Sequence, residues 1–216
     1  MANTAVSALP AAGSFLLADE LPVNEAGTSK KVTGTQIRTA IGAGLNNASV
    51  ASVAGAYAAD AYLAGSAITI PVAGGWAARS VLKWQFDMTK TAAGVATPIL
   101  IVRMGTLGTT GDAAILTLPF LAATAVADLG IFDVTVNFRT VGGGTSAVIN
   151  GMVRCIHQVA GGGLMTTVGS STAPAIVVGV SSGFNSTTQT IIGLSFNGGA
   201  SFSGTNTYVI AAADKL

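Results

Sequence analysis

The chain has 216 residues, which is enough for one domain of ordinary size and an additional segment. Charged residues make up only 9% of it, against about 25% in an average soluble protein, and the net charge is +1. Because the sequence has no basic cluster, it offers little to the phosphates of nucleic acids, and we expect no nucleic-acid partner.

The mean hydropathy of +0.63 is high, but a membrane-spanning helix needs about 20 consecutive, mainly apolar residues. The best candidate, residues 40–59, is interrupted by Asn46, Asn47 and Ser49. We therefore expect no membrane contact, and we expect the apolar excess to be buried against copies of the chain or a larger assembly. The first residues lack the pattern of a secretory signal, and a single cysteine allows no internal disulfide, so we expect synthesis in a cytoplasm.

Residues 1–44 are predicted to form an extended N-terminal arm. A turn cluster at 26–29 between apolar runs predicts a two-stranded β-ribbon, and Thr33 or Thr35 can cap a short helix that carries Ile37. The stretch 18–37 also concentrates charge in a chain that is otherwise poor in it. Because an isolated ribbon is only marginally stable in water, we expect this arm to anchor the protein to a partner. The expected anchoring residues are Leu16, Leu17, Leu21, Val23, Lys30, Lys31, Val32 and Ile37.

Residues 45–61 are mostly small and predict a connector, either a short helix or an extended linker. From residue 62 to 216 the pattern is typical of β-structure. Apolar and polar residues alternate at 80–89 and 131–140, which predicts two half-buried antiparallel strands. Further short strand candidates, separated by glycine-rich turns, bring the total to eight or nine, with no convincing long helix between them. This organisation predicts an all-β fold, a jelly-roll-like antiparallel β-sandwich with the extended arm attached.

The last third of the predicted sandwich has an unusual charge distribution. No Asp, Glu, Lys or Arg occurs between Cys155 and Ala213. Exposed strand edges are usually protected by charge, because their unpaired backbone groups promote aggregation. These strands are therefore expected to be central in their sheets, or to have faces that meet partner subunits.

Few residues could carry chemistry. Cys155 and His157 would share one face of a strand, which allows a nucleophile–base pair or two metal ligands. A structural zinc site needs four ligands and no second Cys or His exists, so we favour a structural interpretation and expect no metal and no cofactor. No spacing singles out two aspartates as the facing carboxylates of a glycosidase, and we expect no catalytic residues. The aspartates considered are Asp60, Asp87, Asp112, Asp128 and Asp133.

The two tryptophans have different expected roles. Trp84 lies on the apolar face of the strand at 80–89 and is predicted to be part of the core. Trp76 lies in a glycine-rich loop, and it is a candidate for an exposed contact with a subunit or a ligand.

Two parts of the chain resemble structural proteins of tailed bacteriophages. Residues 7–37, SALPAAGSFLLADELPVNEAGTSKKVTGTQI, are similar to the N-terminal segment of tail-fibre and virion proteins. The block from residue 62, with YLAGSAITIP, KWQFDMTKTAAGVATPILIVRMGTLGTTGDAAIL and IFDVTVNFRTVG, is similar to a C-terminal β-sandwich module of phage fibres and capsid-associated proteins. The resemblance implies a homotrimeric virion component without catalytic residues. No long shaft separates the two parts, which favours a short appendage or a head decoration protein over a long tail fibre.

We therefore expect a capsid decoration or cement protein located in the virion. It would bind the major capsid protein or other virion proteins through its arm and stabilise the assembled particle. The alternative is a short tail-fibre or receptor-binding protein that recognises a host surface glycan. A polysaccharide depolymerase is a third hypothesis, which the lack of a recognisable carboxylate pair disfavours.

Overall fold

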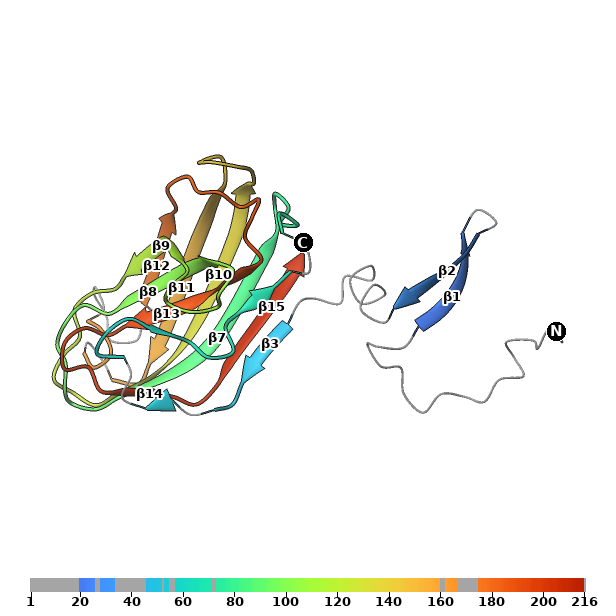
Figure 1. Ribbon diagram of the computed structural model, residues 1–216. Helices are drawn as coiled ribbons and strands as arrows, with labels where there is room; N and C mark the ends of the chain where they lie inside the picture. Colours follow the sequence, from blue (N-terminus) through green and yellow to red (C-terminus); the bar gives the residue numbers. More distant parts are fainter. Residues whose placement is uncertain are drawn as a thin grey trace, which may run out of the picture. The chain divides into compact units, whose positions relative to one another are not determined.

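The computed structural model describes residues 20–25, 28–33, 46–51, 53–54, 57–70, 73–159, 162–166 and 175–215 (Figure 1). The chain divides into two compact units, residues 1–44 and 45–216. Every regular element within the described residues is a β-strand. No helix in this part of the chain is long and apolar enough to cross a membrane.

The first unit contains an antiparallel ribbon. Strand β1 (Glu20–Glu25) pairs with β2 (Thr28–Thr33), and the register runs from Glu20 opposite Thr33 to Glu25 opposite Thr28. The short helix predicted to carry Ile37 falls at 34–45, outside the described residues, and the expected anchors Leu16 and Leu17 also lie outside them.

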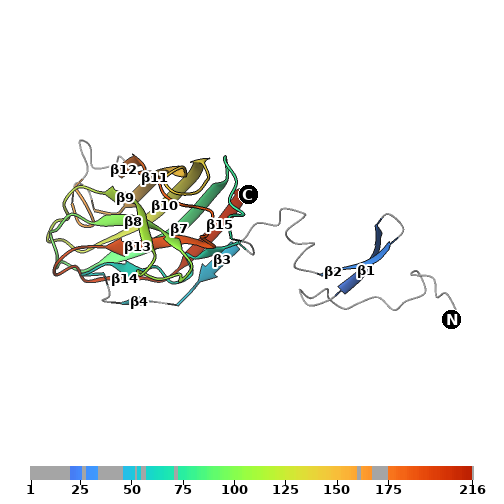
Figure 2. The ribbon, with the colours of Figure 1, turned by 45° about the horizontal axis from the view of Figure 1, so that its top comes forward.

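The second unit is an antiparallel β-sandwich, which confirms the predicted fold class. Figure 2 shows the smaller sheet lying over the larger one. The larger sheet contains β3 (Asn46–Ser49), β4 (Val53–Ala54), β7 (Val81–Lys90), β10 (Asp128–Thr140), β11 (Val148–His157), β12 (Ala175–Val180), β14 (Gly204–Asn206) and β15 (Val209–Lys215). The smaller sheet contains β5 (Ala61–Tyr62), β6 (Ile68–Thr69), β8 (Ile99–Gly105), β9 (Ala113–Pro119) and β13 (Ile191–Asn197).

The strand order places β7 in the middle of the larger sheet. On one side the order is β7-β10-β11-β12, and on the other side β7 pairs with both β14 and β15, which pair in turn with β4 and β3. The smaller sheet has the order β5-β13-β8-β9, and β6 also pairs with β13. Strands β10, β11 and β12 thus follow one another within one sheet. The sandwich does not by itself confirm the finer prediction of a jelly-roll order.

Strands β14 and β15 pair with β7 one after the other, and Thr207 and Tyr208 separate them. Asp87, on β7, lies opposite the interruption. Its carboxylate accepts the backbone N–H of Thr207 at 2.7 Å, the N–H of Tyr208 at 3.0 Å and the hydroxyl of Thr207 at 2.6 Å. The side chain therefore replaces the ladder hydrogen bonds that the backbone cannot make at this point.

The prediction of a connector at 45–61 is wrong, because much of this segment belongs to the sandwich. Strand β3 pairs with β15, and β4 pairs with β14. Tyr57 is fully buried, and its hydroxyl donates a hydrogen bond to Asn206 Oδ1. Burial, together with the charge of Asp87, raises the pKa of Tyr57 to about 12. Small residues without periodicity carry no local signal for pairing with a strand some 160 positions away in the chain.

The core forms where the alternating strands predicted at 80–89 and 131–140 lie side by side. Phe86 is opposite Phe132 in the ladder, and their rings stack with centroids 4.7 Å apart. Phe196, from the smaller sheet, meets both rings edge-on. The predicted core residue Trp84 is buried, and its indole N–H donates to the carbonyl oxygen of Ser66. The alternation of apolar and polar residues in the sequence thus predicted which face of these two strands packs against the smaller sheet.

Two inward-facing glycines let the sheets approach closely at one edge of the sandwich. Gly151 on β11 is opposite Gly179 on β12. A Cβ atom at Gly151 would lie 2.4 Å from Cδ2 of Leu116, and one at Gly179 would lie 2.9 Å from Cδ2 of Leu118. Strand β9, which carries both leucines, therefore packs directly on the backbone of β11 and β12.

Replacing Gly151 with valine should force Leu116 and β9 away from the larger sheet. We expect the G151V variant to lose about 1–3 kcal/mol of unfolding free energy, the usual cost of overpacking a core. The measurement is the urea midpoint followed by tryptophan fluorescence. Gly143→Ala is a suitable control, because the nearest atoms to its added Cβ are 4.0 Å away. Equal midpoints for the two variants would contradict the close approach.

Candidate functional site

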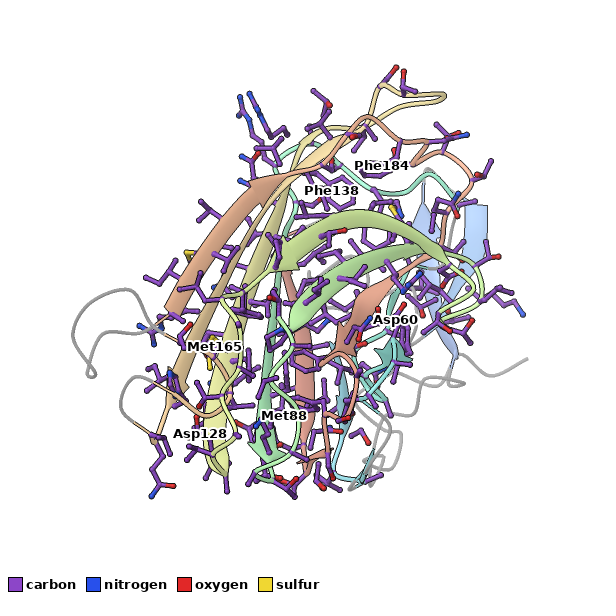
Figure 3. All side chains as sticks on the ribbon, turned by 90° about the vertical axis from the view of Figure 1, so that its left-hand side faces the viewer. Asp60, Met88, Asp128, Phe138, Met165 and Phe184 are labelled. Carbon is purple, nitrogen blue, oxygen red and sulfur yellow. The ribbon has the colours of Figure 1, made fainter. Side chains whose placement is uncertain are left out.

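Asp128 connects three segments at one end of the sandwich, where Figure 3 labels it near Met88 and Met165. Its side chain is fully buried, and Oδ2 lies 2.8 Å from Nδ1 of His157. Both carboxylate oxygens also accept backbone N–H groups, from Leu129, Gln158, Val159 and Leu164. The carboxylate therefore ties the start of β10 to the end of β11 and to the segment 162–166.

The Cys155–His157 pair is part of this structural arrangement. Cys155 is fully buried opposite Phe132, and His157 is almost buried opposite Gly130. Burial, followed by the charges of Asp128 and Asp133, raises the pKa of the Cys155 thiol. A thiol in this state is protonated at neutral pH, whereas a reactive cysteine needs a stabilised thiolate. The described residues also hold no group of three or more His, Cys, Asp or Glu side chains that could bind a metal ion.

Lys90 lies at the same end of the sandwich as Asp128, opposite it in the ladder between β7 and β10. It is buried at the end of β7, and its ammonium group donates to three backbone carbonyl oxygens, at 3.1 Å to Thr91, 2.7 Å to Thr124 and 3.3 Å to Val126. A buried ammonium group is tolerated when its donors are satisfied in this way. Lys90 therefore holds the segment between β9 and β10 against the sandwich.

Arg103 has a corresponding role on the outer side of the smaller sheet. It forms an ion pair with Asp60, and its Nε donates to the hydroxyl of Ser195 at 2.8 Å. Its Nη1 donates to the carbonyl oxygens of Thr110 and Asp112, at 2.9 and 2.6 Å. The carboxylate of Asp112 in turn accepts three N–H groups of its own loop, from Thr106, Leu107 and Gly108.

The five aspartates considered as catalytic candidates thus serve different segments. Asp87 binds the β14–β15 interruption, Asp112 its own loop, Asp128 the β10–β11 end, and Asp60 the guanidinium of Arg103. Asp133 lies on the outer face of the larger sheet, where it accepts hydrogen bonds from Gln85 and Arg154. With these separate partners, no two of the five aspartates form a pair of facing carboxylates.

Asp128→Asn tests the structural role of this carboxylate. An amide replaces one acceptor oxygen with a donor that faces N–H groups, so we expect a loss of about 2–3 kcal/mol in unfolding free energy, typical of lost hydrogen bonds to a buried charge. Chemical denaturation followed by circular dichroism provides the measurement. Asp133→Asn is the matched control, because that carboxylate is partly exposed and should change stability by less than about 0.5 kcal/mol. Similar losses in both variants would contradict the assignment.

Trp76 was a candidate for an exposed contact, and this prediction is wrong. The side chain is buried, its ring stacks on Phe138 with centroids 5.4 Å apart, and its indole N–H donates to the carbonyl oxygen of Gln189. Phe184 meets Phe138 on the same end of the body, opposite to Asp128 (Figure 3). The glycine-rich loop sequence gave no indication that distant residues would enclose this ring.

Of the expected anchoring residues, five fall in the ribbon. Leu21 and Val23 lie in β1, and Lys30, Lys31 and Val32 lie in β2. In the ladder, Leu21 is opposite Val32, and Val23 is opposite Lys30. Lys31 is exposed and Val32 is partly exposed. The ribbon therefore brings together, in paired register, residues that the sequence separates by up to eleven positions.

The outer face of the larger sheet carries a shallow hollow of about 550 Å³ over β10, β11 and β12. Its lining includes Asn137, Arg139, Asn150, Met152, Val178 and Val180. Asn137 and Asn150 are direct cross-strand neighbours, and the Oδ1 atoms of both are enclosed without a hydrogen-bond partner among the described residues. Buried polar atoms are normally paired, so two adjacent unpaired amide oxygens indicate a place where a further donor could bind. This feature could not be predicted from the sequence, because it depends on the register between β10 and β11.

Comparisons with known proteins add little to this geometry. No protein-family model and no curated protein matches the chain. Among solved structures, the chain has a weak likeness to "Structure of infectious bursal disease virus Gx strain", at 10% identity and a TM-score of 0.21. The match covers 91% of this chain and 45% of that one, so the chain spans less than half of the length it is compared with. A likeness at this level carries no argument about fold or function.

Proposed function

We propose that this chain is a structural protein of a tailed-bacteriophage virion, a trimeric capsid decoration or cement protein that binds the particle through its N-terminal arm. The observation that carries the proposal is the division of the chain into a separate first unit, with the β1–β2 ribbon, and a sandwich with its own core. The resemblance of residues 7–37 to N-terminal segments of phage virion proteins supports the same assignment.

The second unit has an extensive core of its own. Among the residues whose burial is described, the buried hydrophobic cluster runs from Tyr57 to Ala213, within the second unit. The ribbon, in contrast, consists of two six-residue strands, and an isolated pair of strands is marginally stable in water. Pairing with a strand of another protein would supply the missing hydrogen bonds and apolar cover. The arm is therefore the part of the chain that gains most from a partner.

The stabilising effect follows from linkage. A protein that binds only the assembled lattice lowers the free energy of the lattice, by about 2.7 kcal/mol per site when its free concentration is 100 times the dissociation constant. Copies that are joined as a trimer bind with a higher effective concentration, which adds avidity without further contacts. A sandwich with a sparsely charged surface, attached at many equivalent positions, would act in this way as a cement.

Deleting residues 1–44 tests the proposal. We expect the truncated protein to keep the circular dichroism spectrum of the sandwich and to lose co-sedimentation with purified particles that lack the endogenous protein. The reason is that the core is retained while the anchoring residues are removed. Deleting only residues 1–15 is the control, because it keeps all the expected anchors. A truncated protein that still binds particles as the full chain does would refute the anchoring role of the arm.

The alternative is a short tail-fibre or receptor-binding protein that recognises a host surface glycan. The hollow beside Asn137 and Asn150 favours it, since amide groups and Arg139 could hydrogen-bond to sugar hydroxyls. Copy number in purified virions separates the two functions. Decoration requires an amount comparable with the major capsid protein, whereas an amount of only a few per cent would contradict decoration and support the tail location.

A further inference from the structure

The hollow on the outer face of the larger sheet contains hydrogen-bonding groups without partners. The Oδ1 atoms of Asn137 and Asn150 are enclosed, and neither accepts a hydrogen bond from a described residue. Arg139, two residues beyond Asn137 on β10, lines the same hollow. It is exposed and has no hydrogen-bond or ion-pair partner among the residues that the structure describes. Two acceptors and one cation therefore lie at one place on the sheet with nothing in the described chain to bind them.

The two asparagines are costly for the fold by itself. An enclosed acceptor that has given up its hydrogen bonds to water, without gaining one in the protein, lowers stability. Asparagine also has a low preference for strands. Asn137 and Asn150 are nevertheless direct neighbours in the ladder between β10 and β11, and Asn150 is opposite the aliphatic Val180 on β12. Residues that oppose the local rules of folding in this way are typical of binding sites.

A ligand in the hollow can reach both amide oxygens. Both side chains line the hollow, and the last torsion of an asparagine side chain is soft. Rotation about this bond turns the oxygen towards the hollow without moving the strands. The volume of about 550 Å³ also lies within the range of small-molecule sites, which is about 300–1,000 Å³.

The groups without partners define the chemistry of the ligand. The amide oxygens are acceptors, so the ligand must donate O–H or N–H groups to them. Arg139 is the charged member of the described lining, and its planar guanidinium matches a carboxylate. Met152 and Val178 add an apolar wall that suits C–H groups. A sugar ring with a carboxylate combines hydroxyl donors, a negative charge and a C–H face.

The charges around the hollow favour a negative ligand. None of the lining residues is acidic, and Lys83 on β7 is opposite Thr135, which belongs to the lining. The next row of the sheet carries Asp133 opposite Arg154, and these two form an exposed ion pair at 3.1 Å. Because the charges of that pair cancel, the surroundings of the hollow remain positive through Arg139 and Lys83.

We propose that the hollow is a binding site for an acidic sugar residue of the uronic acid type. Arg139 binds the carboxylate, and the oxygens of Asn137 and Asn150 accept ring hydroxyl groups. Met152 and Val178 pack against the C–H face of the ring. The inference names the ligand class for the receptor-binding alternative and rests on that function for its biological use. It does not depend on the N-terminal arm.

The test measures binding of two uronic acids to the full chain by saturation-transfer NMR. D-glucuronate and D-galacturonate are compared with D-glucose and D-galactose, which have the same rings without the carboxylate. We expect a dissociation constant on the order of 1 mM for at least one acid, as is usual for a ligand of this size. Its neutral counterpart should bind at least about 10-fold more weakly, because the charge-assisted hydrogen bonds to Arg139 are missing.

Arg139→Gln removes the charge from the lining and keeps N–H donors. We expect this variant to bind the acid at least about 10-fold more weakly than the unmodified chain does. Arg154→Gln is the matched control. It removes the same charge from the same face, but Arg154 is paired with Asp133 and does not line the hollow. Its affinity for the acid should stay within about 2-fold of that of the unmodified chain.

Asn137→Leu separates a binding role from a structural one. Leucine has nearly the same shape without the acceptor, so N137L should lose binding while its melting temperature rises by about 2–4 °C. The control is Asn206→Leu, whose melting temperature should fall, because Oδ1 of Asn206 accepts the hydroxyl of Tyr57. A lower melting temperature for N137L would show that the fold needs this amide and would overturn the inference.

The other outcomes also decide the matter. Absence of binding by both acids overturns the inference, and so does equal affinity for the acids and their neutral counterparts, or for R139Q and the unmodified chain. None of these results affects the decoration proposal, which depends on residues 1–44 and on copy number. Binding of an acid by a chain that attaches to particles without residues 1–44 would support the site and refute the anchoring role of the arm.

Discussion

The stacked rings of Phe86 and Phe132, with Phe196 set edge-on against both, are the contact on which the sandwich depends. Phe86 and Phe132 come from β7 and β10, the two strands at the middle of the larger sheet, and Phe196 comes from the smaller sheet. Aromatic pairs in these geometries contribute about 0.5–1.5 kcal/mol beyond the area that they bury. This cluster therefore joins the two sheets at the middle of the sandwich.

Buried charges then hold the connecting segments to this core. Asp87, Lys90, Arg103 and Asp128 are all largely buried, and each is bonded mainly to backbone groups of a loop or strand end. A charge in such a position is stable only while its partners stay in place. In a chain with so few charged residues, five of those in the second unit, these four and Asp112, are therefore used inside the fold.

That distribution links the fold to the proposed function. In the second unit, β12 exposes the aliphatic side chains of Ile176, Val178 and Val180, and the first unit carries a ribbon of two six-residue strands. The two features suit two kinds of contact. An apolar face is typical of permanent contacts between subunits, whereas a ribbon with both charged and apolar residues suits attachment to the surface of an assembled particle.

The sequence alone determined the strands at 80–89 and 131–140 and the general fold class, because a period of two residues reports directly which face of a strand is buried. It also located the uncharged stretch after Cys155. Only the tertiary structure decided what depends on contacts between distant residues. The pairing of β3 with β15 turned a predicted connector into part of a sheet, and the stacking on Phe138 buried Trp76. The strand order placed β12 at the end of its sheet, where its side chains become a surface. Local sequence patterns record the preference of each residue for burial, but the partner that buries it is chosen by strand register and order, which are properties of the whole chain.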